Sequence, residues 1–349
     1  MKILYLYAEI MGYNIPIINI LSEKYHADVT VISWKKKLTS YKIDNAEEKI
    51  NFHFKEDIGK ERLKSFCLDF NPDLVVVSGW MDKDYLEICK VFKKNNKTKI
   101  VAASDTQWSN SWKHKLASLI APFYHKKMFD FLWVSGSWQY EYARRLGFAN
   151  QNIIFNCLSA NIDLLKNNRI NINNKRTLLF LGRFDKIKGI DLLLNTFRRF
   201  KQETNSNLKL KLIGGGVELD FVKSFESEDV IVKNFVQPSE LIYELEDVTG
   251  FILPSIYEPW GLVIHEMASA GLPLLLTNIC GANTMFAIND YNAFLFEPNS
   301  NEAIYKVLKT YDSLSNEQIV QMGNNSKQLS MRVTPEISAA SLMSVMNIS

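Results

Sequence analysis

The chain has 349 residues, a length that suggests two domains of about 100–200 residues each. Hydrophobic residues make up 47% of it and charged residues 23%, an ordinary globular composition that excludes a disordered chain, a collagen-like fibre and a disulfide scaffold. The net charge of +3 is uneven, since residues 1–160 carry 23 Lys and Arg against 17 Asp and Glu and the remainder carries 18 against 21, but this excess is too small for a nucleic-acid-binding protein.

The first apolar stretch, residues 2–7, is soon followed by Glu9 and by no convincing cleavage site, so it predicts a strand and not a signal peptide. No run of about 18 or more apolar residues is present, so no membrane-spanning helix is expected. The four cysteines lie far apart without a CxxC pair, which favours a reduced cytoplasmic protein.

Short β-branched runs alternate with helical patterns along the whole chain. The predicted strands are residues 2–7, 28–33, 74–78, 100–104 and 131–135, then 178–182, 210–214, 230–235, 251–254, 274–277 and 293–296. Strands that are apolar on both faces need helices on both faces, which predicts parallel sheets. The fold class is therefore α/β, with two Rossmann-like doubly wound domains whose carboxyl strand ends would face a cleft.

An Asn-rich segment without clear periodicity, residues 167–176, indicates a linker or surface loop between the two domains. We place the N-terminal domain at 1–165, the C-terminal domain at 166–330, and a last helix at 331–349. Pro335 suits the first turn of that helix, with Thr334 as its N-cap.

The carboxyl ends of the second-domain strands carry the candidate chemistry. Arg183 and Lys188 lie in the loop between a strand that ends at Gly182 and a helix, and such a cationic pair suits a diphosphate, although two solvated charges explain it equally well. Gly214 belongs to a glycine run that follows the next strand, where a tight turn is the simpler interpretation.

The third motif combines two glutamates with the start of a helix. Pro259 disfavours helix at Glu258, and a helix is predicted from about Gly261, so its first free amides suit a phosphate or a hydroxyl-rich ligand. Glu266 is an acidic residue in an otherwise apolar helix, and it therefore needs a partner such as ribose hydroxyls unless it lies on an exposed helix face.

The ordered motifs Gly182-Arg183…Lys188-Gly189, Ile213-Gly214…Gly216 and Glu258-x7-Glu266 over residues 177–300 resemble the retaining glycosyltransferases of family four, which have the GT-B fold. The resemblance implies that Arg183 and Lys188 bind the diphosphate of a nucleotide sugar, that Glu266 holds the ribose hydroxyls, and that Glu258 accepts hydrogen bonds from the donor sugar. It also implies that the last helix crosses back to the first domain.

The same resemblance implies further donor contacts through the backbone. Amides of Trp260, Gly261 and Leu262 would contact the sugar or the distal phosphate, and the backbone around Phe235 and Val236 would face the base. Glycines complete the expected donor-binding set, at positions Gly12, Gly182 and Gly214.

Catalysis is expected without a metal or any other cofactor, because cationic side chains and a helix N-terminus can stabilise the leaving diphosphate. Asp82 and Asp84 have DxD spacing but precede an amphipathic helix, so we interpret them as an exposed helix start. Retention is expected to follow front-face attack, with the leaving phosphate taking the acceptor proton. Asp105 stands where many family members have a histidine; it is a catalytic candidate, and an N-cap or a partner for Lys113 are the alternatives.

Basic residues bracket an apolar and aromatic stretch at residues 112–128. Two interpretations stay open: a surface helix that binds anionic lipid headgroups, or a helix packed on the sheet with solvated lysines. The first would fit a cytoplasmic protein that is peripheral on the inner membrane.

The predicted function is transfer of a hexosyl or N-acetylhexosaminyl group from a UDP- or GDP-sugar to a glycan or lipid-linked acceptor in bacterial surface polysaccharide synthesis. The alternatives are a sugar-nucleotide epimerase of related fold, an inactive transferase-like subunit and a bilobal binding protein. No nucleic-acid partner is expected.

Overall fold

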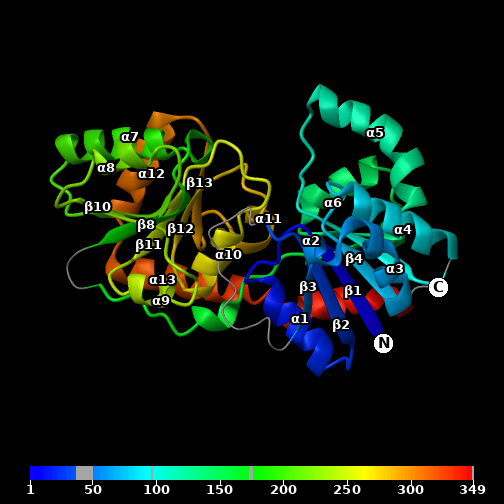
Figure 1. Cartoon of the computed structure of the whole chain (residues 1–349). Helices are drawn as coiled ribbons and strands as arrows, with labels where there is room; N and C mark the ends of the chain where they lie inside the picture. Colours follow the sequence, from blue (N-terminus) through cyan, green and yellow to red (C-terminus); the bar gives the residue numbers. More distant parts are fainter. Residues whose placement is uncertain (37–49, 96, 173–175, 348–349) are drawn as a thin grey trace. The chain divides into compact units, whose positions relative to one another are not determined.

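The computed structural model describes residues 1–36, 50–95, 97–172 and 176–347 of the chain (Figure 1). It divides into two compact units: residues Met1–Ser159 together with those from Val333 onward, and residues Ala160–Arg332. The chain thus leaves the first unit once and returns to it at the end, and the two transitions lie at 159/160 and 332/333 where the sequence suggested 165/166 and 330/331.

The first unit contains a seven-stranded parallel sheet with the order β3-β2-β1-β4-β5-β6-β7. Its strands are β1 (Lys2–Tyr7), β2 (Asp28–Ser33), β3 (Asn51–Phe54), β4 (Leu74–Val77), β5 (Lys99–Ser104), β6 (Phe131–Val134) and β7 (Ile153–Ile154). The sequence missed β3 and β7, the two edge strands, because four and two residues are too short to show a periodicity.

Both faces of this sheet are buried, as the apolar runs require. In β1, Leu4 and Leu6 face one core, whereas Ile3, Tyr5 and Tyr7 face the other. The helices are α1 (Asn14–Glu23), α2 (Lys55–Ile58), α3 (Lys60–Phe70), α4 (Lys83–Asn95), α5 (Trp112–Tyr124), α6 (Ser137–Arg145) and α14 (Pro335–Met343).

Helix α14, the last helix, packs against α1, the first. Thr334 caps it, since the Thr334 side chain accepts a hydrogen bond from the amide of Ile337, and Pro335 occupies its first turn. Both features confirm the start predicted from the sequence. Because Ala339, Leu342 and Val345 enter the core shared with β1, the end of the chain is part of the first unit.

The second unit contains a six-stranded parallel sheet with the order β10-β9-β8-β11-β12-β13. Its strands are β8 (Thr177–Arg183), β9 (Lys209–Gly215), β10 (Val230–Lys233), β11 (Gly250–Leu253), β12 (Leu274–Thr277) and β13 (Ala293–Phe296). Its helices are α7 (Ile190–Glu203), α8 (Leu219–Lys223), α9 (Leu241–Glu244), α10 (Leu262–Ser269), α11 (Asn283–Phe286), α12 (Asn301–Asp312) and α13 (Asn316–Ser330). The predicted extension of β10 to residue 235 was wrong, because the pairing with β9 ends at Lys233.

These two sheets confirm the predicted α/β class with two doubly wound parallel domains. In each sheet the strand order reverses at one point, between β1 and β4 in the first unit and between β8 and β11 in the second. Ligands of open parallel sheets bind outside the carboxyl ends of the strands at such a switch point. The loops after β8 and β11 are therefore where the second unit is built to hold a ligand.

Candidate functional site

The loops after β8 and β11 are joined by an ion pair between Lys188 and Glu258. The Lys188 ammonium donates a hydrogen bond of 2.5 Å to Glu258 Oε2, and both side chains are largely buried, with 18% and 8% of their surfaces exposed. Ser255 Oγ, from the same loop as Glu258, donates to the same oxygen at 3.3 Å. The sequence selected both residues as separate binders; the structure brings them together at the switch point of the sheet.

Two glycines allow this approach. Gly189 has φ +69°, and a Cβ there would lie 2.1 Å from the carbonyl oxygen of Pro254, so only glycine lets the loop after β8 reach the end of β11. Gly261 has φ +88° and lies against the Glu258 side chain, whose Cγ would be 3.0 Å from an added Cβ. The predicted binding position Gly261 is thus also a packing position, directly before α10.

The loop after β12 supports the Glu258 loop through hydrogen bonds, a contribution that was not predicted from the sequence. The amide of Gly281 donates to the carbonyl oxygen of Glu258 at 3.2 Å, and the amide of Ala282 donates to that of Trp260 at 2.9 Å. Thr277, at the end of β12, donates from its hydroxyl to the carbonyl of Ser255. The signal was available, because this glycine-containing loop also follows a predicted strand at its carboxyl end.

Arg183, at the end of β8, is largely exposed and forms an ion pair with Asp185, at 3.4 Å. Asp185 also caps the 3₁₀ turn Lys186–Lys188, since its side chain accepts from the amide of Ile187 at 2.8 Å. An exposed guanidinium held by one carboxylate keeps most of its five N–H donors available for an anion. Asp185 was not predicted as a site residue from the sequence.

Glu266 lies in α10, and burial raises the pKa of its carboxyl group to about 7. Within the described part of the chain, no hydrogen bond or ion pair to this side chain is found. A half-buried carboxyl group without a partner is costly to keep, which is why such groups gather at functional sites. The structure thereby excludes the alternative of a fully exposed helix face.

His265, the neighbour of Glu266, has a structural role. Its Nδ1 accepts from the amide of Ala160 at 3.0 Å, its Nε2 lies 2.9 Å from the carbonyl of Ser330, and its ring stacks on Phe286. Burial lowers the pKa of this imidazole to about 4, so it is neutral. His265 therefore fixes α10 to the backbone at Ala160 and at Ser330.

The remaining candidates of the second unit lie in loops at the carboxyl edge or at strand ends. Gly214 pairs with Gly182 across β8 and β9, and a Cβ on Gly214 would lie 1.9 Å from the Gly182 carbonyl oxygen, so strand packing alone explains it. Phe235 is half-exposed and Val236 partly buried in the loop after β10. Trp260 is buried against Phe286, and Leu262 begins α10.

Two candidates belong to the first unit. Gly12 precedes α1, and Asp105 follows β5 as an exposed residue whose carbonyl oxygen accepts from Gln139 Nε2. Both loops follow the carboxyl ends of parallel strands of one sheet, β1 and β5, and therefore lie at the same edge. Burial, followed by the charge of Asp105, raises the pKa of Tyr13, the neighbour of Gly12. The N-cap alternative for Asp105 was wrong: Ser111 caps α5 by accepting from the amide of His114. The Lys113 side chain lies outside the described residues.

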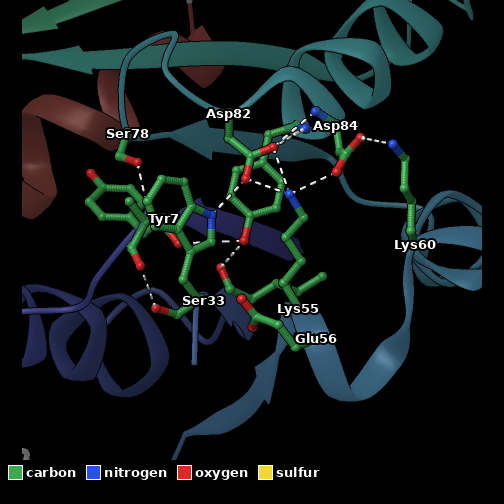
Figure 2. Close-up of polar contacts among 12 residues, drawn as sticks. Tyr7, Ser33, Lys55, Glu56, Lys60, Ser78, Asp82 and Asp84 are labelled. Carbon is green, nitrogen blue, oxygen red and sulfur yellow. Dashed lines mark hydrogen bonds and ion pairs between the residues drawn. The ribbon is translucent and has the colours of Figure 1, made fainter. Parts of the chain in front are cut away.

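Asp82 and Asp84 start α4 as predicted, but the expectation that this start is exposed was wrong for Asp82. Figure 2 shows the Asp82 carboxylate held by Lys55, with an Nζ–Oδ2 distance of 2.6 Å, and it also accepts from the indole of Trp34. It caps α4 by accepting from the amides of Asp84 and Tyr85. Lys55, which the strand pattern did not reveal, covers it from the end of β3.

Lys55 also reaches Asp84, at 2.9 Å, and Lys60 lies 3.6 Å from the same carboxylate. The hydrogen bond from Lys55 lowers the pKa of Asp84. Burial on its own would lower the pKa of Lys55, but the hydrogen bonds from Lys55 to Asp82 and Asp84 outweigh burial and raise this pKa. The two aspartates of the DxD motif thus belong to an ion-pair cluster with Lys55, and this cluster connects the loops after β2, β3 and β4.

Residues 163–329, nearly the whole second unit, match the family model for glycosyl transferases group 1. Over these residues the second unit is similar to this family. An uncharacterized 41.2 kDa protein in the cps region of Klebsiella pneumoniae is 28% identical over 180 residues, which are 49% of each chain. The Escherichia coli UDP-Gal:α-D-GlcNAc-diphosphoundecaprenol α-1,3-galactosyltransferase is 29% identical over 122 residues, 35% of this chain and 26% of that one. The chain spans about half the length or less of these curated relatives.

The two units have the GT-B fold of solved glycosyltransferases. The structure of Anabaena HepE in complex with UDP and glucose covers 100% of both chains, with a TM-score of 0.75 and 13% identity. At this identity the likeness concerns the fold. No helix of the described residues is both long enough and apolar enough to cross a membrane.

Proposed function

We propose that the protein is a metal-independent retaining glycosyltransferase that uses a nucleotide-diphosphate sugar. The observation that carries this proposal is the Lys188–Glu258 ion pair at the switch point of a unit that matches the group 1 glycosyl transferases. Arg183 is near this pair in sequence, and the carboxyl group of Glu266, which follows it, has no partner among the described residues. These are the residue types that diphosphate and ribose recognition require.

Cleavage of the bond between the anomeric carbon and the phosphate oxygen places negative charge on the departing diphosphate. An ammonium has three N–H donors, so the hydrogen bond from Lys188 to Glu258 leaves two for phosphate oxygens. Arg183 adds a planar fork of donors from the end of the preceding strand. Charge that is fixed in place before the reaction stabilises the leaving group without reorganisation.

Glu258 has two tasks in this mechanism. Its Oε2 holds Lys188 and accepts from Ser255, whereas its Oε1 has no hydrogen bond within the described residues and is the atom available to a donor-sugar hydroxyl. Glu266 would accept hydrogen bonds from two ribose hydroxyls. Donor binding would thus supply the partner that this half-buried carboxyl group lacks among the described residues. Binding a diol favours the charged carboxylate, so donor binding would lower the pKa of Glu266.

We propose front-face attack for the retaining step: the acceptor oxygen bonds to the anomeric carbon as the sugar–phosphate bond breaks, and the leaving phosphate oxygen takes the acceptor proton. Asp105 would contact the reacting groups from the first unit, in place of the family histidine. No cofactor is involved. A covalent glycosyl-enzyme on Glu258 would contradict this mechanism.

We further propose a UDP- or GDP-hexose or N-acetylhexosamine donor and a glycan or lipid-linked acceptor in bacterial surface polysaccharide synthesis. Two likenesses support these finer assignments: a relative named for transfer from UDP-Gal to a diphosphoundecaprenol-linked sugar, and a structural neighbour solved with UDP. The four cysteines are free and buried, which suits a reducing compartment such as the cytoplasm.

Thermal unfolding with a panel of nucleotides and nucleotide sugars tests the proposal. A preferred ligand at 100 times its Kd stabilises the folded state by about 2.7 kcal/mol, and the stabilisation should survive chelation of divalent ions. Arg183→Ala and Glu266→Ala should lose this stabilisation, whereas Glu228→Gln, an exposed glutamate of the same unit, should keep it. If both site variants keep it, the site assignment is wrong; if turnover needs a divalent ion, the mechanism is wrong.

A further inference from the structure

Helix α5 exposes its large apolar side chains to solvent. Leu119 and Phe123 are 70% and 75% exposed, and Trp112 is 70% exposed. Together with Leu116 and Ile120, they follow the spacing of one helix face, i, i+4, i+7, i+8 and i+11. Figure 1 shows α5 at the upper rim of the first unit, between β5 and α6 in the chain.

Apart from His114, whose ring stacks on Tyr142, the side of α5 that faces the unit carries small residues. Ala121 is buried and Ala117 partly buried, and a Cβ on Gly147, which follows α6, would lie 2.8 Å from Cβ of Pro122. A helix that only packs on a sheet has the reverse pattern, with large apolar residues inward. The interpretation of 112–128 as an ordinary packed helix therefore does not explain its exposed face, and contiguous exposed apolar surface marks an interaction site.

An apolar groove of about 450 Å³ continues this face toward the body of the unit. Its walls are Trp112, Leu116, Ile120 and Tyr124 of α5 on one side and Trp80, Tyr142 and Leu146 on the other. The exposed stripe and the groove thus form one apolar surface, which we call the α5 face.

The charge of the surrounding residues indicates which kind of partner binds the α5 face. The sequence has no Asp or Glu between Asp105 and Asp130, and it has four lysines and two histidines there. Lys115 and Lys127 are exposed at the two ends of the stripe. Lysine is depleted from the cores of protein–protein interfaces, whereas lysines that flank an apolar aromatic helix attract anionic lipid headgroups.

We propose that α5 is an interfacial helix that docks the first unit on a bilayer containing anionic lipid. Leu119, Phe123 and Trp112 enter the boundary between headgroups and acyl chains, and Lys115 and Lys127 bind the headgroups. The helix lies in the plane of the membrane, since its 13 residues are too few to cross it. Docking depends on the first unit alone; only its consequence, that a lipid-linked acceptor is met at this surface, rests on the proposed function.

Sedimentation of the full chain with vesicles tests docking. We expect binding to phosphatidylcholine vesicles that contain about one-third phosphatidylglycerol, weak binding to phosphatidylcholine alone, and loss of binding as salt rises. Lys115→Gln/Lys127→Gln should weaken the partition coefficient about 5-fold for each lysine. Leu119→Ser/Phe123→Ser should weaken it at least about 10-fold.

Two controls keep the test specific. Tyr243→Ser/Val320→Ser removes two exposed apolar side chains from the second unit and should bind vesicles as the unchanged protein does. Brominated lipid should quench the fluorescence of the unchanged protein more than that of Trp112→Phe. A urea unfolding curve verifies that each variant is folded.

Three results would overturn docking: equal binding to neutral vesicles, unchanged binding by the Leu119/Phe123 variant, or a dimer that this variant dissociates without any vesicle binding. The last result would make the α5 face a contact between copies of the chain. Stabilisation by nucleotide is measured on the same samples. Its absence with intact vesicle binding would reject the proposed donor chemistry and leave docking standing.

Discussion

The carboxyl group of Glu266 has a different pKa in the folded and unfolded chain, because burial raises it from 4.5 to about 7 in the folded state. Between these values the folded protein binds the proton more tightly, so this group makes stability fall as the pH rises from about 4.5 to 7. Glu266→Gln removes the ionisation, and we expect it to stabilise the second unit by on the order of 1–3 kcal/mol at pH 8 but not at pH 4.

Urea unfolding at the two pH values measures this effect, and thermal unfolding with nucleotide measures the function. The variant should be more stable at pH 8 and bind nucleotide more weakly, a trade that is typical of functional carboxylates. The Glu228→Gln control should change neither quantity. A loss of stability at pH 8 would show that Glu266 has a structural partner.

Lys188 and Glu258 depend on each other because both side chains are largely buried. Lys188→Met leaves the Glu258 carboxylate without its cation and should cost about 3–5 kcal/mol of stability, and Glu258→Gln should be destabilising for the converse reason. The double variant should recover much of this loss, since no unpaired charge remains. All three variants should lose sugar transfer.

A double-mutant cycle from urea unfolding gives the coupling energy, and Lys223→Met, at an exposed lysine of the same unit, is the control. Additive losses in the cycle would show that the pair is not coupled. Transfer by the double variant would remove both residues from the mechanism.

Residue type and position after a strand were sufficient to select Lys188 and Glu258 from the sequence, and Glu266 stood out as an acidic residue in an apolar helix. The pairing of Lys188 with Glu258 was not predictable, because it joins residues 70 positions apart through the order of strands in the sheet. For Gly214 the sequence suggested more than the structure requires. Its place in a motif suggested contact with a ligand, whereas the close approach of the Gly182 backbone is sufficient to explain why a glycine is needed there.

At the scale of elements, the Asp82 cluster fixes α4 to the loops after β2 and β3. Asp82→Ala removes the cap of α4, the acceptor for Trp34 and the partner of Lys55 together, and we expect it to destabilise the first unit by about 3–5 kcal/mol. Lys60→Gln removes only the long ion pair between an exposed lysine and Asp84, and the change in stability should stay within about 0.5 kcal/mol. Equal effects in urea unfolding would mean that the cluster is as solvated as the sequence suggested.

The long central strands were predictable because each is an apolar run between turn signals, whereas β3 and the cover of Asp82 were not. The sequence Asn51–Phe54 is short and only partly buried, so it carries little pattern. Without β3, the position of Lys55 at a strand end is unknown, and Asp82 looks like any helix start in solvent. One missed edge strand thus accounts for the wrong expectation of exposure.

At the scale of the molecule, the chain crosses from the first unit to the second and returns, so the stability of the first unit depends on both chain ends. Leu342 of α14 is fully buried in the core shared with α1 and β1. Leu342→Ala should destabilise the first unit by about 2–5 kcal/mol and leave the second unit unchanged. Ile337→Ala, at a half-exposed position of the same helix, is the control and should cost much less.

Unfolding with and without nucleotide can assign the two transitions, because a ligand that binds the second unit shifts only the transition of that unit. We expect Leu342→Ala to lower the other transition, the one that nucleotide does not raise. If the midpoint of the nucleotide-sensitive transition falls by the same amount, the two units unfold together. In that case α14 stabilises the whole molecule, because the chain that returns to the first unit links the unfolding of one unit to that of the other.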